Sequence, residues 1–246
     1  MGKDKIRRFA ENATFRCVVQ PGFEEVFRKD YALKGKWNRD FFGNDRPIVL
    51  ELGCGRGEYT VALGERFPER NFIGVDVKGA RLGRGAKTAT ENGMKNVAFL
   101  RTRIEFIDSC FAPGEVDEIW ITFPDPQLNK NRIKKRLTAP QFLAMYARFL
   151  REGGMINLKT DSVHLHEYTK NLARGNGLPA ACCDDIYGTG FADEVLSIKT
   201  TYEQRFLQEG LPITYLRFGF GDRREFETIP FAPDEALLSA GVAVQR

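Results

Sequence analysis

Two carboxylates beside a glycine-rich turn give this sequence its clearest chemical signal. Glu51 ends a short apolar run and is followed by three alternating glycines, Gly53, Gly55 and Gly57. Glycine lets the backbone turn sharply and approach a ligand without a Cβ in the way. Asp76 ends the next apolar run, about twenty residues further on, where a Rossmann-like fold places an acid that binds ribose hydroxyls. The pattern therefore predicts a site for a nucleoside cofactor.

The spacing of the glycines distinguishes between cofactors. A dinucleotide fingerprint is Gly-x-Gly-x-x-Gly, but here the third glycine comes one residue early and Glu58 stands in its place. A carboxylate such as Glu51 is a poor neighbour for pyrophosphate and a good one for an ammonium. We therefore expect S-adenosylmethionine, with its cationic amino-acid end, bound by Glu51, Gly53, Gly55 and Asp76. The pattern Glu-x-Gly-x-Gly-x-Gly resembles motif I of class I methyltransferases.

A third carboxylate, Asp125, stands between two prolines directly after another apolar run, residues 118–123. Prolines on both sides restrict the backbone there. Ligands of open α/β sheets bind at the carboxyl ends of strands, near the point where the strand order reverses. We expect strand 118–123 beside strand 48–52, so that Asp125 faces Glu51 and contacts cofactor, substrate or both.

A run of positive charges follows Asp125 within a few residues. Charge runs are usually solvated surfaces, but this one comes immediately after the predicted reaction site, which favours a loop that binds a polyanion. Its members are Lys130, Arg132, Lys134, Lys135 and Arg136. The first eight residues hold four more cations, which form either a solvated terminus or an arm that touches phosphate. These are Lys3, Lys5, Arg7 and Arg8.

Alternating strand and helix signals must position these groups. We expect strands at 48–52, 71–75, 97–101, 118–123, 155–159 and 213–220, with helices near 58–66, 78–92, 139–151 and 162–174. This alternation predicts βαβ units and a mostly parallel sheet. Gly153 and Gly154 are expected to end a helix, residues 181–193 to be irregular, and residues 195–209 to run from a loop into a helix. The divisions are an N-terminal basic arm and covering segment (1–46), a catalytic domain (47–220) and a C-terminal tail (221–246) with no assigned role.

Composition narrows the class of protein. With 246 residues, 42% of them hydrophobic, the chain suits one large α/β domain with appendages. Its formal charge of +4 permits a nucleic-acid partner without requiring one. Five cysteines without a Cys-x-x-Cys pair indicate a reduced, cytoplasmic protein without a zinc framework. There is neither a signal peptide nor an apolar run of membrane-spanning length. His164 and His166 would point to different faces of a helix, so we expect no metal there.

Four motifs, in this order, resemble the tRNA (guanine-N7-)-methyltransferase family. They are motif I, Phe123-Pro124-Asp125-Pro126 with the basic run behind it, Leu158-Lys159-Thr160-Asp161, and Thr200-Thr201-Tyr202-Glu203-Gln204-Arg205. The resemblance covers roughly residues 11–220. It implies a Rossmann-like class I methyltransferase fold with a seven-stranded sheet, and transfer of a methyl group from S-adenosylmethionine to N7 of the guanine at position 46, in the variable loop of tRNA.

The resemblance also implies roles for individual residues. Asp125 would be catalytic and would touch the cofactor, whereas Asp161, Thr200 and Glu203 match positions assigned to the guanine substrate. Carboxylates accept hydrogen bonds from N–H donors, which suits the N1 and N2 edge of guanine. Guanine N7 has a lone pair and no proton to lose, so a missing catalytic histidine or cysteine pair is expected.

Three positions depart from the family pattern. Gln127 stands where an aromatic residue is common, which weakens any prediction of stacking there. Asn129 stands where a substrate-contacting lysine is usual, and Lys130 is expected to replace it. Arg103 stands where an acid is often assigned to the adenine end of the cofactor; an arginine could stack on adenine instead.

Other functions stay open on the sequence alone. A nicotinamide-dependent oxidoreductase would share the glycine turn and Asp76, but Glu51 and the glycine spacing disfavour it. A non-catalytic RNA-binding module could keep the same fold, and a methyltransferase could act on another RNA or on a small molecule. The sequence does not distinguish a monomer from a homodimer.

Overall fold

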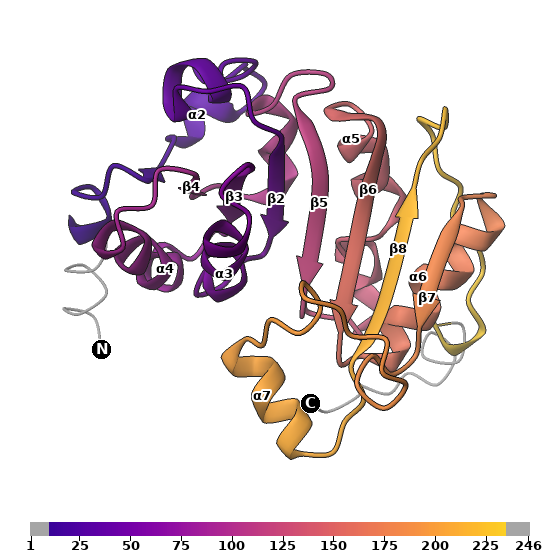
Figure 1. Ribbon diagram of the computed structural model, residues 1–246. Coiled ribbons are helices and arrows are strands. Elements are labelled where there is room, and N and C mark those ends of the chain that lie inside the picture. Colours follow the sequence, from indigo (N-terminus) through magenta and orange to yellow (C-terminus); the bar gives the residue numbers. More distant parts are fainter. Residues whose placement is uncertain (1–9, 235–246) are drawn as a thin grey trace.

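The structure, a computed structural model, describes residues 10–234 (Figure 1). The predicted basic arm with Lys3, Lys5, Arg7 and Arg8 lies outside these residues. So do residues 235–246 of the predicted tail and the side chain of Lys130.

In the described part of the chain, eight strands form one sheet in the order β1-β4-β3-β2-β5-β6-β8-β7. Strands β1 to β6 are parallel, whereas β8 is antiparallel to both β6 and β7. The predicted Rossmann-like α/β fold with a mostly parallel sheet is confirmed. Seven strands were expected, and the sheet of the described residues has eight; one of the eight, β1, has two residues and pairs with β4. The bounds are β1 Val18–Val19, β2 Ile48–Leu52, β3 Asn71–Val75, β4 Val97–Leu100, β5 Val116–Thr122, β6 Leu150–Thr160, β7 Ala180–Cys183 and β8 Thr214–Gly219.

Helices cover both faces of the sheet (Figure 1). Helices α3 (Glu58–Arg66) and α4 (Gly79–Glu91) pack on one face, and α5 (Pro140–Tyr146) and α6 (Val163–Gly175) pack on the other. The residues of β2 alternate between the two cores, because successive side chains of a strand point to opposite faces. The remaining helical segments are α2 Phe23–Val26, η1 Trp37–Phe42, η2 Ile104–Ser109, η3 Lys130–Lys135 and α7 Thr201–Gln208.

The strand order reverses at β2. Strand β3 pairs with β2 on one side, and β5 pairs with it on the other, with Leu52 opposite Ile121. The predicted neighbours are therefore confirmed, and the carboxyl ends of β2 and β5 meet where open α/β sheets bind their ligands.

The prediction that Gly153 and Gly154 end a helix is wrong. Helix α5 already ends at Tyr146, and β6 runs through both glycines. The pairing of β6 with β5 shifts at this point: Val116 lies opposite Leu150, but Glu118 lies opposite Met155. Gly153 therefore lies in a β-bulge. Its φ of +71° favours glycine there, just as a left-handed residue at a helix end does.

Residues 181–193 were predicted to be irregular, yet β7 occupies Ala180–Cys183. Its sequence has no alternating apolar pattern and is mostly exposed. The strand forms because it pairs with β8, with Cys183 opposite Tyr215. Tertiary pairing thus overrides a weak local preference.

The segment before β2 closes one end of the core. Trp37 is fully buried, donates its indole N–H to the Cys110 carbonyl at 2.9 Å and stacks on Phe111. Phe23 and Phe27, by contrast, stack on each other with their rings 4.7 Å apart and remain exposed. Within the predicted segment 1–46, Trp37 thus packs into the core, whereas Phe23 and Phe27 stay at the surface; the division itself stays a prediction.

Candidate active site

The glycine-rich turn joins β2 to α3, and each of its glycines has a left-handed backbone. The φ angles are +76° at Gly53, +56° at Gly55 and +71° at Gly57, values that residues with a Cβ disfavour. A Cβ on Gly57 would also lie 2.4 Å from the ring of Phe99. Next to Gly53 and Gly55 the nearest atoms are 3.8 and 3.9 Å from such a Cβ. The turn is thus packed against β4 at Gly57 and leaves space at its outer part.

Glu51 lies beneath this turn and is only 3% exposed. One carboxylate oxygen accepts hydrogen bonds from the backbone N–H of Thr60, at 2.9 Å, and from its hydroxyl. The other oxygen accepts from the hydroxyl of Thr122 at 2.6 Å. Burial raises the pKa of Glu51 to about 7, although these hydrogen bonds oppose the rise. The carboxyl group therefore joins the ends of β2 and β5 to the first turn of α3.

Asp76 connects the turn to the end of β3. One carboxylate oxygen accepts from the backbone N–H of Gly55 at 3.0 Å, and the other accepts from that of Lys78 at 2.7 Å. An ionised carboxylate offers about four acceptor positions, so Asp76 keeps capacity for further donors. It is 9% exposed, which leaves a narrow access for them.

These groups fit a cofactor with ribose hydroxyls and a cationic amino-acid end. Asp76 can accept from hydroxyls, and the outer turn at Gly53 and Gly55 has room for a close approach of the ligand. Glu51 supplies negative charge beneath the turn when it is ionised. An ammonium nearby would favour that ionised form, which matches the chemistry of S-adenosylmethionine.

The loop that holds Asp125 has an unusual backbone. Phe123 and Gln127 have φ angles of +47° and +51°, which are rare for residues other than glycine. The N–H of Gln127 donates to the Asp125 carboxylate at 3.0 Å, and the N–H of Phe123 donates to the Lys159 carbonyl at 2.8 Å. Strained backbone of this kind persists only where the surroundings impose it, and it is concentrated at functional sites. Asp125 is exposed between these two residues.

Four predicted acids lie in or just after the carboxyl-terminal parts of neighbouring strands, whose carboxyl ends form the lower edge of the sheet in Figure 1. Glu51 belongs to β2, Asp76 follows β3, Asp125 comes after β5 and Asp161 follows β6. Arg103 follows β4 and is exposed, with its guanidinium 3.0 Å from the Glu105 carboxylate. The role of Arg103 at the adenine end of the cofactor stays a prediction.

The predicted guanine contacts have different surroundings. Asp161 is half-buried, and burial raises the pKa of its carboxyl group. Thr200 is the N-cap of α7, where its hydroxyl accepts from the N–H of Glu203 at 3.2 Å. Glu203 itself is fully buried, so its carboxylate points into the protein. Lys130 lies at the start of η3, and its side chain is not among the described ones.

Glu203 forms a buried ion pair with Lys159 of β6. The ammonium lies 2.7 Å from one carboxylate oxygen and 2.8 Å from the other. The ammonium also donates to the carbonyls of Leu196 and Ile198, and the Tyr187 hydroxyl donates to Glu203 at 2.6 Å. Burial lowers the pKa of Lys159, which the nearby carboxylate opposes. The pair fixes the start of α7 and the preceding loop to the sheet.

Sequence reasoning did not identify these supporting residues. Lys159 and Thr122 are polar residues inside apolar strands, and such positions usually mark a buried hydrogen bond. That signal could have identified Lys159 as a buried cation. Thr60 and Tyr187 gave no signal, because their partners are distant in sequence and only the fold brings them close.

Some side chains of the basic run lie at the surface, and one is buried in the interior. Arg132, Lys134 and Lys135 of η3 are exposed, as a phosphate-binding surface requires. Arg136 is completely buried, with its guanidinium 2.6 Å from the Asp234 carboxylate. Its predicted place in a polyanion-binding loop is therefore wrong. Sequence spacing does not show that the chain turns inward after Lys135.

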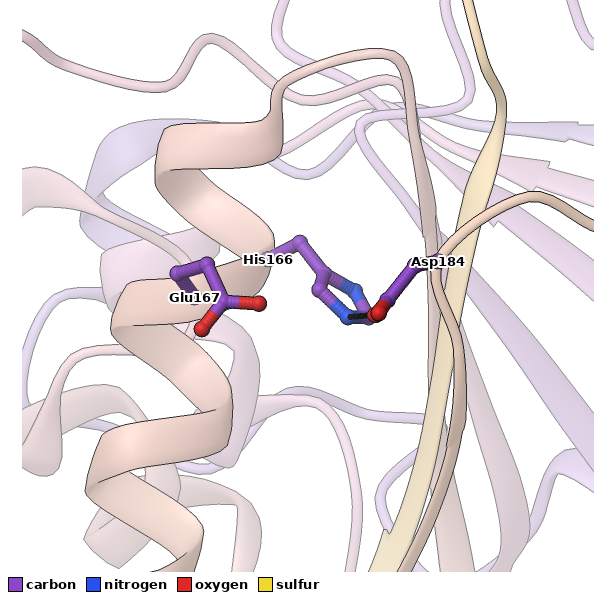
Figure 2. A group of neighbouring side chains, drawn as sticks. All are labelled: His166, Glu167 and Asp184. Carbon is purple, nitrogen blue, oxygen red and sulfur yellow. Dashed lines mark hydrogen bonds and ion pairs between the residues drawn. The ribbon is translucent and has the colours of Figure 1, made fainter.

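The two histidines of α6 point to different places, as predicted. His164 Nε2 lies 2.8 Å from Asp234, whereas His166 Nε2 lies 3.0 Å from Asp184 (Figure 2). His166, Glu167 and Asp184 place possible metal ligands within 4.8 Å of one another. The ammonium of Lys170 is 3.2 Å from Glu167 and 3.5 Å from Asp184. The Lys170 ammonium therefore lies beside both carboxylates.

Comparisons with known proteins show the relatives of this chain. It is 56% identical to a tRNA (guanine-N(7)-)-methyltransferase of Porphyromonas gingivalis, over 85% of this chain and 86% of the relative. It is 53% identical to one of Christiangramia forsetii, over 88% and 97%. A protein of the same name from Listeria monocytogenes is 34% identical over 76% and 86%.

Residues 45–216 match the family model described as "Putative methyltransferase". Among solved structures, the 16S rRNA methyltransferase KamB aligns with a TM-score of 0.56 at 17% identity, over 78% of this chain and 94% of that one. A second structure, titled an antibiotic-related methyltransferase, aligns with a TM-score of 0.52 at 18% identity, over 73% and 90%. At these identities the likeness concerns the fold. Within residues 10–234, no helix is long and apolar enough to span a bilayer.

The raised pKa of Glu51 predicts a pH-dependent stability. The folded chain keeps the Glu51 proton up to about pH 7, whereas in the unfolded chain the group ionises near its ordinary pKa of 4.5. The contribution of Glu51 to stability therefore falls as pH rises from about 4.5 to about 7, by roughly 3 kcal/mol. Glu51→Gln removes this loss. In urea unfolding, the free energy of unfolding of the variant, relative to that of wild type, is expected to rise by roughly 3 kcal/mol between pH 4.5 and pH 8.

Other titrating groups cancel in this comparison, because both proteins share them. A difference in unfolding free energy that stays constant over this pH range would contradict the assignment of a raised pKa to Glu51.

Proposed function

The chain belongs to the tRNA (guanine-N(7)-)-methyltransferase family, and we propose that it transfers a methyl group from S-adenosylmethionine to N7 of the guanine at position 46 of tRNA. The observation that supports this most is the placement of Asp125. Its loop follows β5, next to β2 and the glycine turn, and two left-handed residues hold it there. An exposed basic segment follows it directly.

The methyl donor would lie along the carboxyl ends of β2 and β3. We assign its ribose to Asp76, its amino-acid end to the turn at Gly53 and Gly55 above Glu51, and its adenine to the neighbourhood of Arg103. When bound, S-adenosylmethionine supplies an electrophilic methyl group on a sulfonium. The buried Glu51 acts from beneath the turn, because its oxygens already bond to Thr60 and Thr122.

The reaction at guanine needs alignment more than proton transfer. N7 attacks with a lone pair in the plane of the ring and has no proton to lose, so no general base is required. Holding the reacting atoms in line can supply much of the rate enhancement. The purine gains positive charge as the new bond forms, and the Asp125 carboxylate is placed to stabilise that charge. The fixed backbone around Asp125 gives this effect without reorganisation.

The guanine must leave its stack before N7 can reach the site. We assign Asp161 and Thr200 to its N1 and N2 edge, because both lie at the same end of the fold as Asp125. The raised pKa of Asp161 is lowered again if N–H donors of the base bind it. Glu203 reaches the base only if its pair with Lys159 opens; otherwise it supports Thr200 from below. Lys130 is assigned to the phosphate backbone.

The RNA itself would bind across η3. Arg132, Lys134 and Lys135 are exposed there, and cations beside a reaction site attract a polyanion. Because tRNA is a cytoplasmic substrate, we place the protein in the cytoplasm. Its five free cysteines agree with that compartment.

Replacing the catalytic carboxylate tests the reaction. Asp125→Ala is expected to lower the rate of methyl transfer at least a hundredfold and to leave tRNA affinity within about twofold, because the η3 cations remain. The measurement is transfer of labelled methyl groups to an unmodified tRNA transcript, together with a filter-binding titration. A transcript with adenosine at position 46 serves as control and is expected to take up no label.

Equal rates for wild type and Asp125→Ala would remove Asp125 from the mechanism. Equal labelling of the two transcripts would overturn the proposed position.

Removing exposed charge tests the RNA surface. The double variant Lys134→Ala, Lys135→Ala is expected to weaken tRNA binding and to reduce the slope of log K against log salt by roughly 1.5 to 2. The matched control is Arg148→Ala, Arg151→Ala, which removes two exposed charges near the start of β6, at the opposite edge of the sheet. That control should keep the wild-type slope. If both variants change the slope equally, η3 is not the binding surface.

A further inference from the structure

The segment after β8 lies along α6, on the outer side of the molecule (Figure 1). Asn176 and Glu227 exchange two hydrogen bonds of 3.0 and 2.8 Å, and the Asn171 amide donates to the Pro230 carbonyl at 2.9 Å. Ile229 packs so closely on Gly175 that a Cβ there would lie 2.6 Å from it. We call residues 222–234 the C-terminal strap.

Two side chains of the strap, Phe231 and Asp234, pack against α6 and Arg136. Phe231 packs edge-on against the rings of His164 and Tyr168, with centroids 5.3 and 5.8 Å apart. Asp234 is 6% exposed and accepts from two guanidinium nitrogens of Arg136, at 2.6 and 2.8 Å. Burial alone would raise the pKa of Asp234, but the bonds from Arg136 and His164 hold it below its ordinary value. The strap therefore places the Asp234 carboxylate beside the buried Arg136.

Arg136 also contacts the active-site loop, through Nε and through Nη2, the second of which it shares with Asp234. Nε donates to the Pro126 carbonyl at 3.0 Å, and Nη2 lies 3.5 Å from the Gln127 carbonyl. The guanidinium also stacks over Tyr168 at 4.3 Å. A fully buried guanidinium is stable only with such partners. Its planar fork can meet a carboxylate on one side and carbonyls on the other, which a lysine cannot do.

Pro126 and Gln127 directly follow Asp125, and the N–H of Gln127 bonds to the Asp125 carboxylate. The contacts thus form a continuous path from Asp234 through Arg136 to the backbone that orients Asp125. We infer that Arg136 and Asp234 are positioning residues that fix the Asp125 loop, so that the Asp234 carboxylate, rather than the C-terminal strap as a whole, supports catalytic geometry. This inference rests on the proposed function, because it assigns Asp125 to methyl transfer.

The test separates positioning from general stability. Asp234→Asn removes the charge that pairs with Arg136 and nearly keeps the size of the side chain. We expect kcat to fall about ten- to a hundredfold, because small misplacements of a reacting group cost that much, with the KM for tRNA and for S-adenosylmethionine within about twofold of wild type. Asp234→Glu keeps the carboxylate and is expected to retain most of the wild-type rate.

The control is Asn171→Ala, which loosens the strap at Pro230 without touching Arg136. It should reduce the unfolding midpoint somewhat and leave kcat unchanged. All variants are assayed well below their unfolding midpoints. If Asp234→Asn keeps the wild-type kcat, or if kcat falls only in step with stability in both variants, the inference is wrong.

A second readout does not need activity. Hydrogen exchange of a peptide covering residues 123–129 is expected to be at least tenfold faster in Asp234→Asn than in wild type, with β2 and β5 unchanged. If wild type methylates no tRNA, the proposed function fails, and this exchange rate alone decides whether the pair holds the loop. Unchanged exchange in the loop would overturn the inference in either case.

Discussion

The site depends on the hydrogen bonds that the buried carboxyl group of Glu51 accepts. The carboxyl group joins β2 to the first turn of α3 through Thr60 and to the end of β5 through Thr122. The glycine turn that would hold the cofactor lies directly above it, and the loop of Asp125 begins one residue after Thr122. One acid therefore sets the position of both halves of the site. This position buries the carboxyl group, and burial raises the pKa of Glu51 to about 7.

Two buried ion pairs also hold loops of the site in place. Lys159 and Glu203 fix the start of α7, and Arg136 and Asp234 fix the loop after Asp125. Breaking a buried pair leaves an uncompensated charge, which costs about 3–5 kcal/mol. Such pairs therefore allow few alternative arrangements of the loops that they hold. The exposed Asp125 can stay in a strained loop because rigid groups surround it.

The sequence predicted the parts of the fold that depend on local patterns. Strands β2 and β3 and helix α3 were predicted with their observed bounds, because apolar runs and glycines mark them directly. The start of β6 and the whole of β7 were missed, because a bulge at Gly153 and pairing with β8 decide them. Glu51, Asp76 and Asp125 were singled out from their places at strand ends, and Asp161 from the family resemblance. Their surroundings were not predicted, since neither the burial of Glu203 nor that of Arg136 is visible in spacing.

The atom of guanine that receives the methyl group is the most decisive property of this site to measure. A site built for alignment, with a fixed carboxylate and no general base in its mechanism, suits N7, whereas methylation of guanine N1 or N2 requires loss of a proton. Purified protein would be incubated with S-adenosylmethionine and an unmodified tRNA transcript, and the nucleosides separated and identified by mass and retention. We expect 7-methylguanosine as the product. Formation of 1-methylguanosine or N2-methylguanosine instead would contradict this expectation.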